Sequence, residues 1–229
     1  MAIVAAVIGA AFAVPGVLVV WRAVRSASDP GAWWDDVRDP LWRTIQLATI
    51  VSLSTAVLGT ALAWLLVRTD LPGRRAWRLI LVLPLGLPSF VGAAAFLAGT
   101  APGGFLHEVL GWFSLEPPRR LRGLGVSWFV LTVFTYPYVL LPVGARLTAL
   151  SSSLDESARL LGHSAWSTFR RVTLPQMRSA ILGGSLLVFL YCVSEFGAVQ
   201  LLGYDTLTRV VFATQLVDRP TSFAAASAL

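Results

Sequence analysis

The stretch LDESARLLGHSAWSTFRRVTLP, residues 154–175, is the most polar long segment of a chain that is otherwise strongly apolar. Its residues predict two short helices joined by a glycine. Ser153 and Glu156 have the S-x-x-E spacing of a capping box, in which each side chain satisfies an unpaired amide of the first helical turn. Gly162 suits the left-handed position that ends a helix, and Ser164 can cap the helix that follows. The stretch is therefore predicted to be folded rather than a flexible linker.

Both predicted helices are amphipathic. Apolar residues recur at helical spacing, and they are Leu154, Ala158 and Leu161 in the first helix and Trp166, Phe169 and Val172 in the second. Pro175 is expected to end the second helix before the next apolar run begins. Such an element could lie flat on a membrane as an interfacial anchor, or it could dock as a helix in a groove of a partner protein. The residues alone leave both functions open.

Apolar segments surround this stretch on both sides, each close to the ~20 residues needed to cross a bilayer core. They are residues 2–21, 41–67, 79–100, 126–147 and 181–202, and residues 222–229 look like the start of a sixth. The prolines within them are tolerated in membrane helices, where neighbouring groups satisfy the freed backbone. We therefore predict an all-α, polytopic transmembrane bundle with five complete spans. It would form a single domain over residues 1–229, truncated at its C-terminal end, with a loop at residues 149–178.

A cleaved signal peptide is the alternative for the first segment, but residues 2–21 lack the positively charged start of such peptides. Composition supports a membrane protein, because 56% of the residues are hydrophobic and only 13% are charged, against roughly 25% in soluble domains. The net charge of +6 comes from arginines placed between apolar runs, which suits lipid headgroups rather than nucleic acid.

The loops indicate which side of the membrane holds the polar stretch. On its side we count nine arginines and three acidic residues, against eight and eight on the other side. The positive-inside rule counts basic residues, so a difference of one arginine favours the cytoplasm for the polar stretch by a narrow margin, and the RRLR sequence at residues 119–122 argues for the opposite orientation. The motif that the polar stretch carries decides the orientation. All 18 Lys and Arg residues are arginines, so a phosphate-binding loop of the G-x-x-x-x-G-K-[ST] type cannot be present. No residue pattern calls for a cofactor or a metal.

The polar stretch resembles a known motif. The pattern E-S-A-x3-G-x9-V-x-L-P is carried by Glu156, Ser157, Ala158, Gly162, Val172, Leu174 and Pro175. It is similar to the EAA loop of binding-protein-dependent ABC transporter permeases, whose pattern is E-A-A, three residues, G, nine residues, I-x-L-P. This chain departs from it by serine at position 157 and valine at position 172, and the spacing is intact.

The resemblance implies a type I importer permease of the inner membrane that has no catalytic site of its own. The loop would fold into a coupling helix that sits in a cleft of a separate cytoplasmic ABC ATPase. By position, this docking helix holds Leu154, Asp155, Glu156, Ser157, Ala158 and Gly162. A second permease half or subunit would complete the pore. Solute would arrive on an extracytoplasmic binding protein, which is expected to dock near residues 33–39 and 205–219.

Glu195 is an acidic residue within the predicted fifth span, which makes it a functional-site candidate. It could face the translocation path, pair with an arginine of a partner span, or stay hydrated near the outer surface. Residues 195–206 resemble a segment of ferric-iron-type permeases, in which an acidic residue precedes F-G-A and a G-Y-D-T turn follows. The similarity covers the first half of those long chains. It implies ferric iron as the solute, with thiamine, a polyamine or another small solute as alternatives.

Tyr136 and Tyr138 in the fourth span are further candidates for the path, although tyrosine in a helix bundle more often packs or sits at the membrane interface. An intramembrane enzyme is the alternative from another class. It would need several catalytic groups at membrane depth, where we find Glu195, whereas His107 and His163 both fall in loops. A purely structural anchor would need neither proline-bearing spans nor a capped cytoplasmic helix pair.

Overall fold

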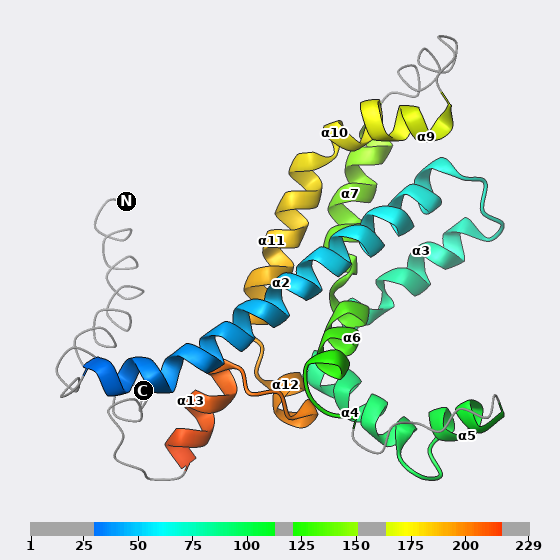
Figure 1. Ribbon diagram of the computed structural model, residues 1–229. Coiled ribbons are helices and arrows are strands. Elements are labelled where there is room, and N and C mark those ends of the chain that lie inside the picture. Colours follow the sequence, from blue (N-terminus) through cyan, green and yellow to red (C-terminus); the bar gives the residue numbers. More distant parts are fainter. Residues whose placement is uncertain (1–29, 113–120, 151–163, 217–229) are drawn as a thin grey trace, which may run out of the picture. The chain divides into compact units, whose positions relative to one another are not determined.

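The computed structural model describes residues 30–112, 121–150 and 164–216, and every regular element within these ranges is a helix (Figure 1). The elements are α2 (Pro30–Arg68), α3 (Arg74–Val82), η1 (Leu83–Gly86), α4 (Ser89–Thr100), α5 (Phe105–Trp112), α6 (Leu124–Thr135), α7 (Pro137–Ala149), α9 (Ala165–Thr168), η2 (Phe169–Thr173), α10 (Leu174–Gln176), α11 (Arg178–Ser194), α12 (Gly197–Leu202) and α13 (Leu207–Leu216). The predicted span at residues 2–21, the docking helix at 154–162 and residues 222–229 lie outside the described residues. Over the part that the structure describes, the prediction of a helical chain is confirmed.

The chain divides into two compact units. The large unit is Ile45–Tyr204, and the small unit is Met1–Thr44 with Asp205–Leu229, of which residues 30–44 and 205–216 are described. The buried apolar core, from Leu47 to Tyr204, lies within the large unit.

Two helices are long and apolar enough to cross a membrane, namely Val37–Arg68 and Leu124–Ala149. The bent pair Arg74–Gly86 with Ser89–Thr100 passes the same test at a bend of 99°, and Phe169–Gln176 with Arg178–Ser194 passes it at 59°. By length and composition, the described residues therefore contain two helices suited to cross a membrane, or up to four if each bent pair is one span. This supports a polytopic membrane protein, while the total of five complete spans stays a prediction.

The predicted span at residues 79–100 is broken in its middle by Pro88. Leu87 is extended, with φ −114° and ψ 129°, and Pro88 is extended as well, with φ −60° and ψ 140°. A residue before proline avoids the helical region because its backbone clashes with the proline ring, so the helix that contains Leu83 stops here. The Pro88 carbonyl then accepts the N–H groups of Val91 and Gly92 and begins α4.

The predicted span at residues 181–202 is also interrupted. Helix α11 ends at Ser194, Glu195 is extended with φ −68° and ψ 129°, and α12 begins at Gly197. No proline or glycine precedes this break, so hydropathy alone does not reveal it. The cause is the side chain of Glu195, which accepts the Ala198 N–H at 2.8 Å and so starts a new helix.

Helix α7 is the centre of the large unit, and α2 and α11 both pack against it at Val139. A Cβ atom on Gly59 of α2 would lie 2.8 Å from the Val139 Cβ. A Cβ atom on Gly184 of α11 would lie 2.8 Å from the Tyr138 carbonyl oxygen and 2.9 Å from the Val139 Cα. Glycine at these two positions lets the backbones approach closely, which is how membrane helices gain packing contacts without a hydrophobic driving force between them.

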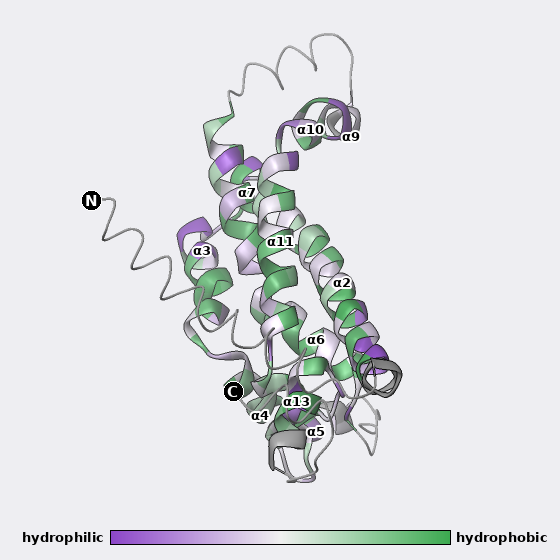
Figure 2. Ribbon diagram, turned by 90° about the vertical axis from the view of Figure 1, so that its left-hand side faces the viewer, coloured by the Kyte–Doolittle hydropathy of each residue, from purple (hydrophilic) through white to green (hydrophobic). Residues whose placement is uncertain are grey.

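The opposite face of α11 is apolar and exposed. Leu182, Leu186 and Leu190 recur at four-residue steps, and each is more than half exposed. Figure 2 shows apolar residues along most of α11, with hydrophilic residues near the start of α3 and around α9. A long apolar stripe of this kind would be a liability in water, so it is suited to lipid chains or to other membrane helices.

The close approach of α11 to α7 yields a stability prediction. Gly184→Ala forces a methyl group against the α7 backbone and should lower the free energy of unfolding in detergent micelles by about 1–3 kcal/mol. Gly183→Ala is the matched control, since a Cβ there meets no atom within 4 Å. It should leave stability unchanged or raise it slightly, because alanine has the higher helix propensity. Equal stability of the two variants would contradict the packing described here.

Candidate functional site

The second half of the polar stretch, residues 164–176, is helical. It consists of α9, η2 and α10, and η2 is a π-helix. The Ser167 backbone N–H donates to Ser164 Oγ at 3.3 Å, so the predicted cap at Ser164 is confirmed. This part of the loop is therefore an ordered element that follows directly on the predicted docking helix.

Pro175 does not end this helix, contrary to the expectation from the sequence. It lies inside α10, and the chain bends only after Gln176. A proline within a helix removes a backbone hydrogen bond and crowds the carbonyl four residues earlier. The wider π-helical turn of η2 directly before it accommodates this crowding, and the Gln176 side-chain amide donates to the Val172 carbonyl at 3.0 Å.

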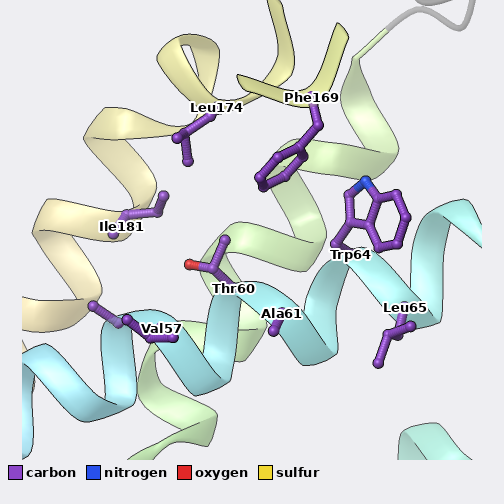
Figure 3. A pocket seen from close by; sticks show the side chains of 9 residues that line it. Val57, Thr60, Ala61, Trp64, Leu65, Phe169, Leu174 and Ile181 are labelled. Atoms are coloured by element: carbon purple, nitrogen blue, oxygen red, sulfur yellow. The ribbon is translucent and has the colours of Figure 1, made fainter. Parts of the chain in front are cut away.

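Phe169 attaches this segment to the membrane helices. Its ring meets Trp64 of α2 edge to face, with the ring centroids 5.9 Å apart and an interplanar angle of 72°. Both rings border an apolar cavity of about 810 Å³, into which the Thr60 side chain points (Figure 3). Leu174 and Ile181 line the same cavity from η2–α10 and α11. The segment therefore contacts α2 through this ring pair and borders a cavity that it shares with α11.

Glu195 is buried, with 8% of its surface exposed, and both of its carboxylate oxygens are engaged. Ser89 Oγ donates to Glu195 Oε2 at 2.9 Å, and the Ala198 backbone N–H donates to Glu195 Oε1 at 2.8 Å. Ser89 is the first residue of α4, and Ala198 lies in the first turn of α12. The carboxylate therefore joins the starts of two helices that follow breaks in two different predicted spans.

Tyr191 extends this polar group towards α7. Its phenol interacts with Ser89 and Glu195, and its ring lies 5.9 Å from that of Tyr138. Two of the residues predicted for the translocation path, Tyr138 and Glu195, are thereby brought into one neighbourhood. The third, Tyr136, is used differently: it is 7% exposed, and its hydroxyl donates to the Leu81 carbonyl at 2.9 Å.

Sequence reasoning missed Ser89 and Tyr191. A signal existed for each of them. Tyr191 precedes Glu195 by four residues, a spacing that places both on one face of the helical span predicted from the sequence. Ser89 follows Pro88 directly, at a helix start, where a hydroxyl commonly finds a polar partner. The pairing of Ser89 with Glu195 has no sequence signal, because 106 residues separate them.

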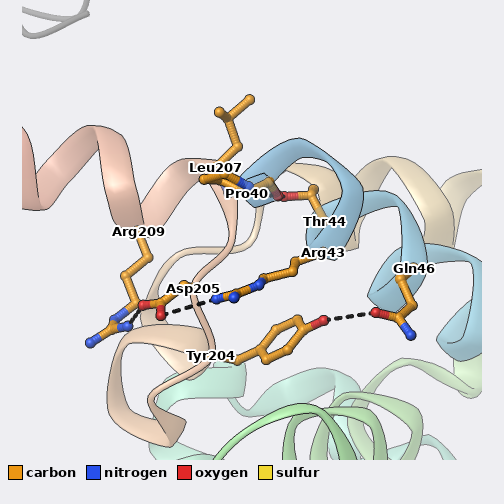
Figure 4. A network of polar contacts seen from close by, with 8 residues as sticks. All are labelled: Pro40, Arg43, Thr44, Gln46, Tyr204, Asp205, Leu207 and Arg209. Atoms are coloured by element: carbon orange, nitrogen blue, oxygen red, sulfur yellow. Dashed lines mark hydrogen bonds and ion pairs between the residues drawn. The ribbon is translucent and has the colours of Figure 1, made fainter. Parts of the chain in front are cut away.

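In the small unit, polar contacts hold the first part of α2 to the start of α13 (Figure 4). Arg43 pairs with Asp205 at 3.2 Å, and Arg209 pairs with the other oxygen of the same carboxylate. The Leu207 backbone N–H donates to Thr44 Oγ1 at 2.9 Å. These residues lie in or beside the regions predicted to receive a binding protein, and the network brings the two chain segments together.

The sequence model of the family described as "Binding-protein-dependent transport system inner membrane component" matches residues 55–228. The chain belongs to this family. Similar proteins include the sulfate transport system permease protein CysW of Escherichia coli strain K12, 33% identical over 168 residues, which are 73% of this chain and 56% of that protein. The chain thus spans little more than half the length of this relative.

Two further relatives name other solutes. The molybdenum transport system permease protein ModB of Escherichia coli strain K12 is 34% identical over 166 residues, 70% of this chain and 71% of that protein. The Fe(3+)-transport system permease protein FbpB 2 of Haemophilus influenzae is 33% identical over 172 residues, 75% of this chain and 30% of that protein. The ferric-iron type is therefore one of several types that this permease resembles.

These findings confirm the resemblance drawn from the E-S-A pattern. The chain belongs to a family of inner-membrane permease components of binding-protein-dependent transport systems, and its long apolar helices suit a multi-pass membrane protein.

The contact between Phe169 and Trp64 predicts how firmly α9–α10 is held. Phe169→Ala removes an aromatic pair worth about 0.5–1.5 kcal/mol beyond its buried area, so amide hydrogen exchange in residues 165–176 should become about tenfold faster. Arg170→Ala is the neighbouring control, because Arg170 is exposed, and it should leave exchange unchanged. If Phe169→Ala exchanges like the unsubstituted permease, the anchor is not at this contact.

Proposed function

We propose that this chain forms one half of the translocation pore of an ATP-driven importer. Solute would arrive on an extracytoplasmic binding protein, and a separate cytoplasmic ABC ATPase would drive the change of access. The match of residues 55–228 to the permease family is the observation that carries the proposal. A second permease half or subunit completes the pore, in the way that paired bundles surround a site in other transporters.

The described part of the loop supports coupling to an ATPase. The proposed docking helix holds Leu154, Asp155, Glu156, Ser157, Ala158 and Gly162, all outside the described residues. The element that follows it is helical, contacts Trp64 of α2 through Phe169, and packs against the core through Leu174. Force applied to the docking helix would pass along this element into the membrane helices. This role also explains Val172, Leu174 and Pro175 as parts of a rigid connector.

Ferric iron is the solute that the E-F-G-A and G-Y-D-T segments favour, and we keep it as the first candidate. A tetrahedral oxyanion is the second, since relatives are named for sulfate and molybdenum transport. One geometric observation favours the second candidate: both oxygens of Glu195 already accept hydrogen bonds within the protein. Among the residues described, no group of three His, Cys, Asp or Glu side chains is arranged to hold a metal ion.

Coupling is tested at Gly162. Gly162→Leu places a β-carbon and a bulky side chain at a position expected to be left-handed, so the docking helix should end differently. In the complete transporter we expect normal insertion, ATP hydrolysis that no longer responds to solute, and uptake reduced by tenfold or more. Cysteines placed at Asp155 and Ala158 should cross-link to the ATPase subunit. Failure of every such cysteine to capture the ATPase would refute docking at this helix.

The solute is tested at Glu195 by uptake of radioactive iron, sulfate and molybdate in the complete transporter. Glu195→Gln keeps the size and one acceptor oxygen but removes the negative charge. If the carboxylate helps a cation along a path of low dielectric, iron uptake should fall by tenfold or more while ATPase coupling persists. Sulfate or molybdate uptake that is unchanged or raised would identify an oxyanion permease. Unimpaired iron uptake would remove Glu195 from the path of the cation.

A further inference from the structure

Two predicted spans are broken, and their breaks meet. The helix of the third span is interrupted at Leu87 and Pro88, and that of the fifth is interrupted at Glu195. The helices that follow, α4 and α12, pack closely, since a Cβ atom on Gly197 would lie 2.8 Å from the Phe90 Cβ. Figure 1 shows α4 and α12 next to each other, at the opposite end of α11 from α10.

One carboxylate connects the two breaks. Glu195 Oε1 accepts the Ala198 N–H of α12, and Glu195 Oε2 accepts the hydroxyl of Ser89 at the start of α4. A negative charge beside a helix N-terminus is favourable because the helix dipole is positive there. Here one charge lies beside two such ends. Glu195 thus supplies an acceptor for the Ala198 amide at the second break, which a bilayer could not supply, and holds the Ser89 hydroxyl at the first.

Separating α4 from α12 would be costly. Glu195 is 8% exposed, so moving Ser89 away would leave a buried carboxylate oxygen without that donor. A buried charged group that loses a hydrogen bond costs more than a neutral one. The two half-helices are therefore bound to each other more firmly than apolar packing alone would bind them.

We propose that Ser89 is a positioning residue, which holds the Glu195 carboxylate so that α4 and α12 move as one body while access alternates. This inference rests on the proposed importer function, because it concerns the movement that the ATPase drives. It makes Ser89 a positioning residue, and it gives Glu195 a mechanical role that does not depend on which solute passes.

The movement can be measured by pulsed electron paramagnetic resonance on spin labels in the complete transporter, without nucleotide and with trapped ATP. The native Cys192 is replaced by alanine. One label pair, at Ala95 and Leu201, spans α4 and α12, and a second pair, at Leu53 and Leu201, spans α2 and α12. All three labelled positions are exposed. We expect ATP to change the second distance and to leave the first unchanged and narrowly distributed.

Substitutions then test the joint itself. Ser89→Ala removes the donor and should increase the population with a longer Ala95–Leu201 distance on the order of tenfold. Ser89→Thr retains a hydroxyl and should restore the narrow distribution, which loss of packing at this position would not explain. Glu195→Gln keeps the Ala198 cap and can donate to Ser89, so it should keep the joint closed even where it alters cation uptake. Glu195→Ala should open it.

Ser194→Ala is the matched control. Ser194 adjoins Glu195, but its hydroxyl donates to the carbonyls of Leu190 and Tyr191 in its own helix. It should change neither distance. If Ser89→Ala gives the same Ala95–Leu201 distribution as the unsubstituted permease, or if ATP alters that distance as much as the Leu53–Leu201 distance, the joint is refuted. If ATP alters neither distance while Ser89→Ala still broadens the first, the joint stands and the importer function fails.

Discussion

A break in a membrane helix is stable only if the backbone groups that it frees find partners inside the protein, because lipid offers none. This chain contains two such breaks, and much of its structure depends on which groups pair with the backbone that they free. At Pro88 the missing N–H of proline is no loss at a helix start, and the Pro88 carbonyl takes up the first amides of α4. At Glu195 the side chain takes the place of the backbone and caps α12. At both breaks the chain turns while these amides keep acceptors within the protein.

The contacts between helices also depend on close approach of the backbone. Helices α2 and α11 both pack on α7, and both approach Val139 through a glycine. Close backbone contact replaces the hydrophobic driving force that is absent between helices in lipid. Helix α11 thus has two fixed points, one at Gly184 against α7 and one at Glu195 against Ser89. Its other end continues into the α10 segment that is anchored through Phe169 on Trp64. The α10 segment thus connects α11, and through it the joint of α4 and α12, to the contact of Phe169 with Trp64.

The chemistry of Glu195 bears on the question of the solute. An acidic residue in an apolar span first indicates a path for cations. In the structure its oxygens serve Ser89 and Ala198, and that task is equally useful to a permease for anions. Relatives named for sulfate, molybdenum and ferric iron are similar to this chain to nearly the same degree, so overall identity does not choose between them.

The sequence by itself determined the features that depend on near neighbours along the chain. Apolar runs of membrane length indicated helices, the E-S-A spacing indicated the permease family, and Ser164 indicated a cap that involves a residue three positions away. Rules based on single residues failed at two positions. The sequence predicts that Pro175 ends a helix, but the π-helical turn before this proline lets the helix continue to Gln176. Glu195 ends α11 within a segment that hydropathy marks as one apolar run. Only the tertiary structure decided that Ser89 meets Glu195 and that Phe169 meets Trp64. Such pairs form because bent helices are packed side by side, and no pattern of adjacent residues records which distant side chains the packing brings together.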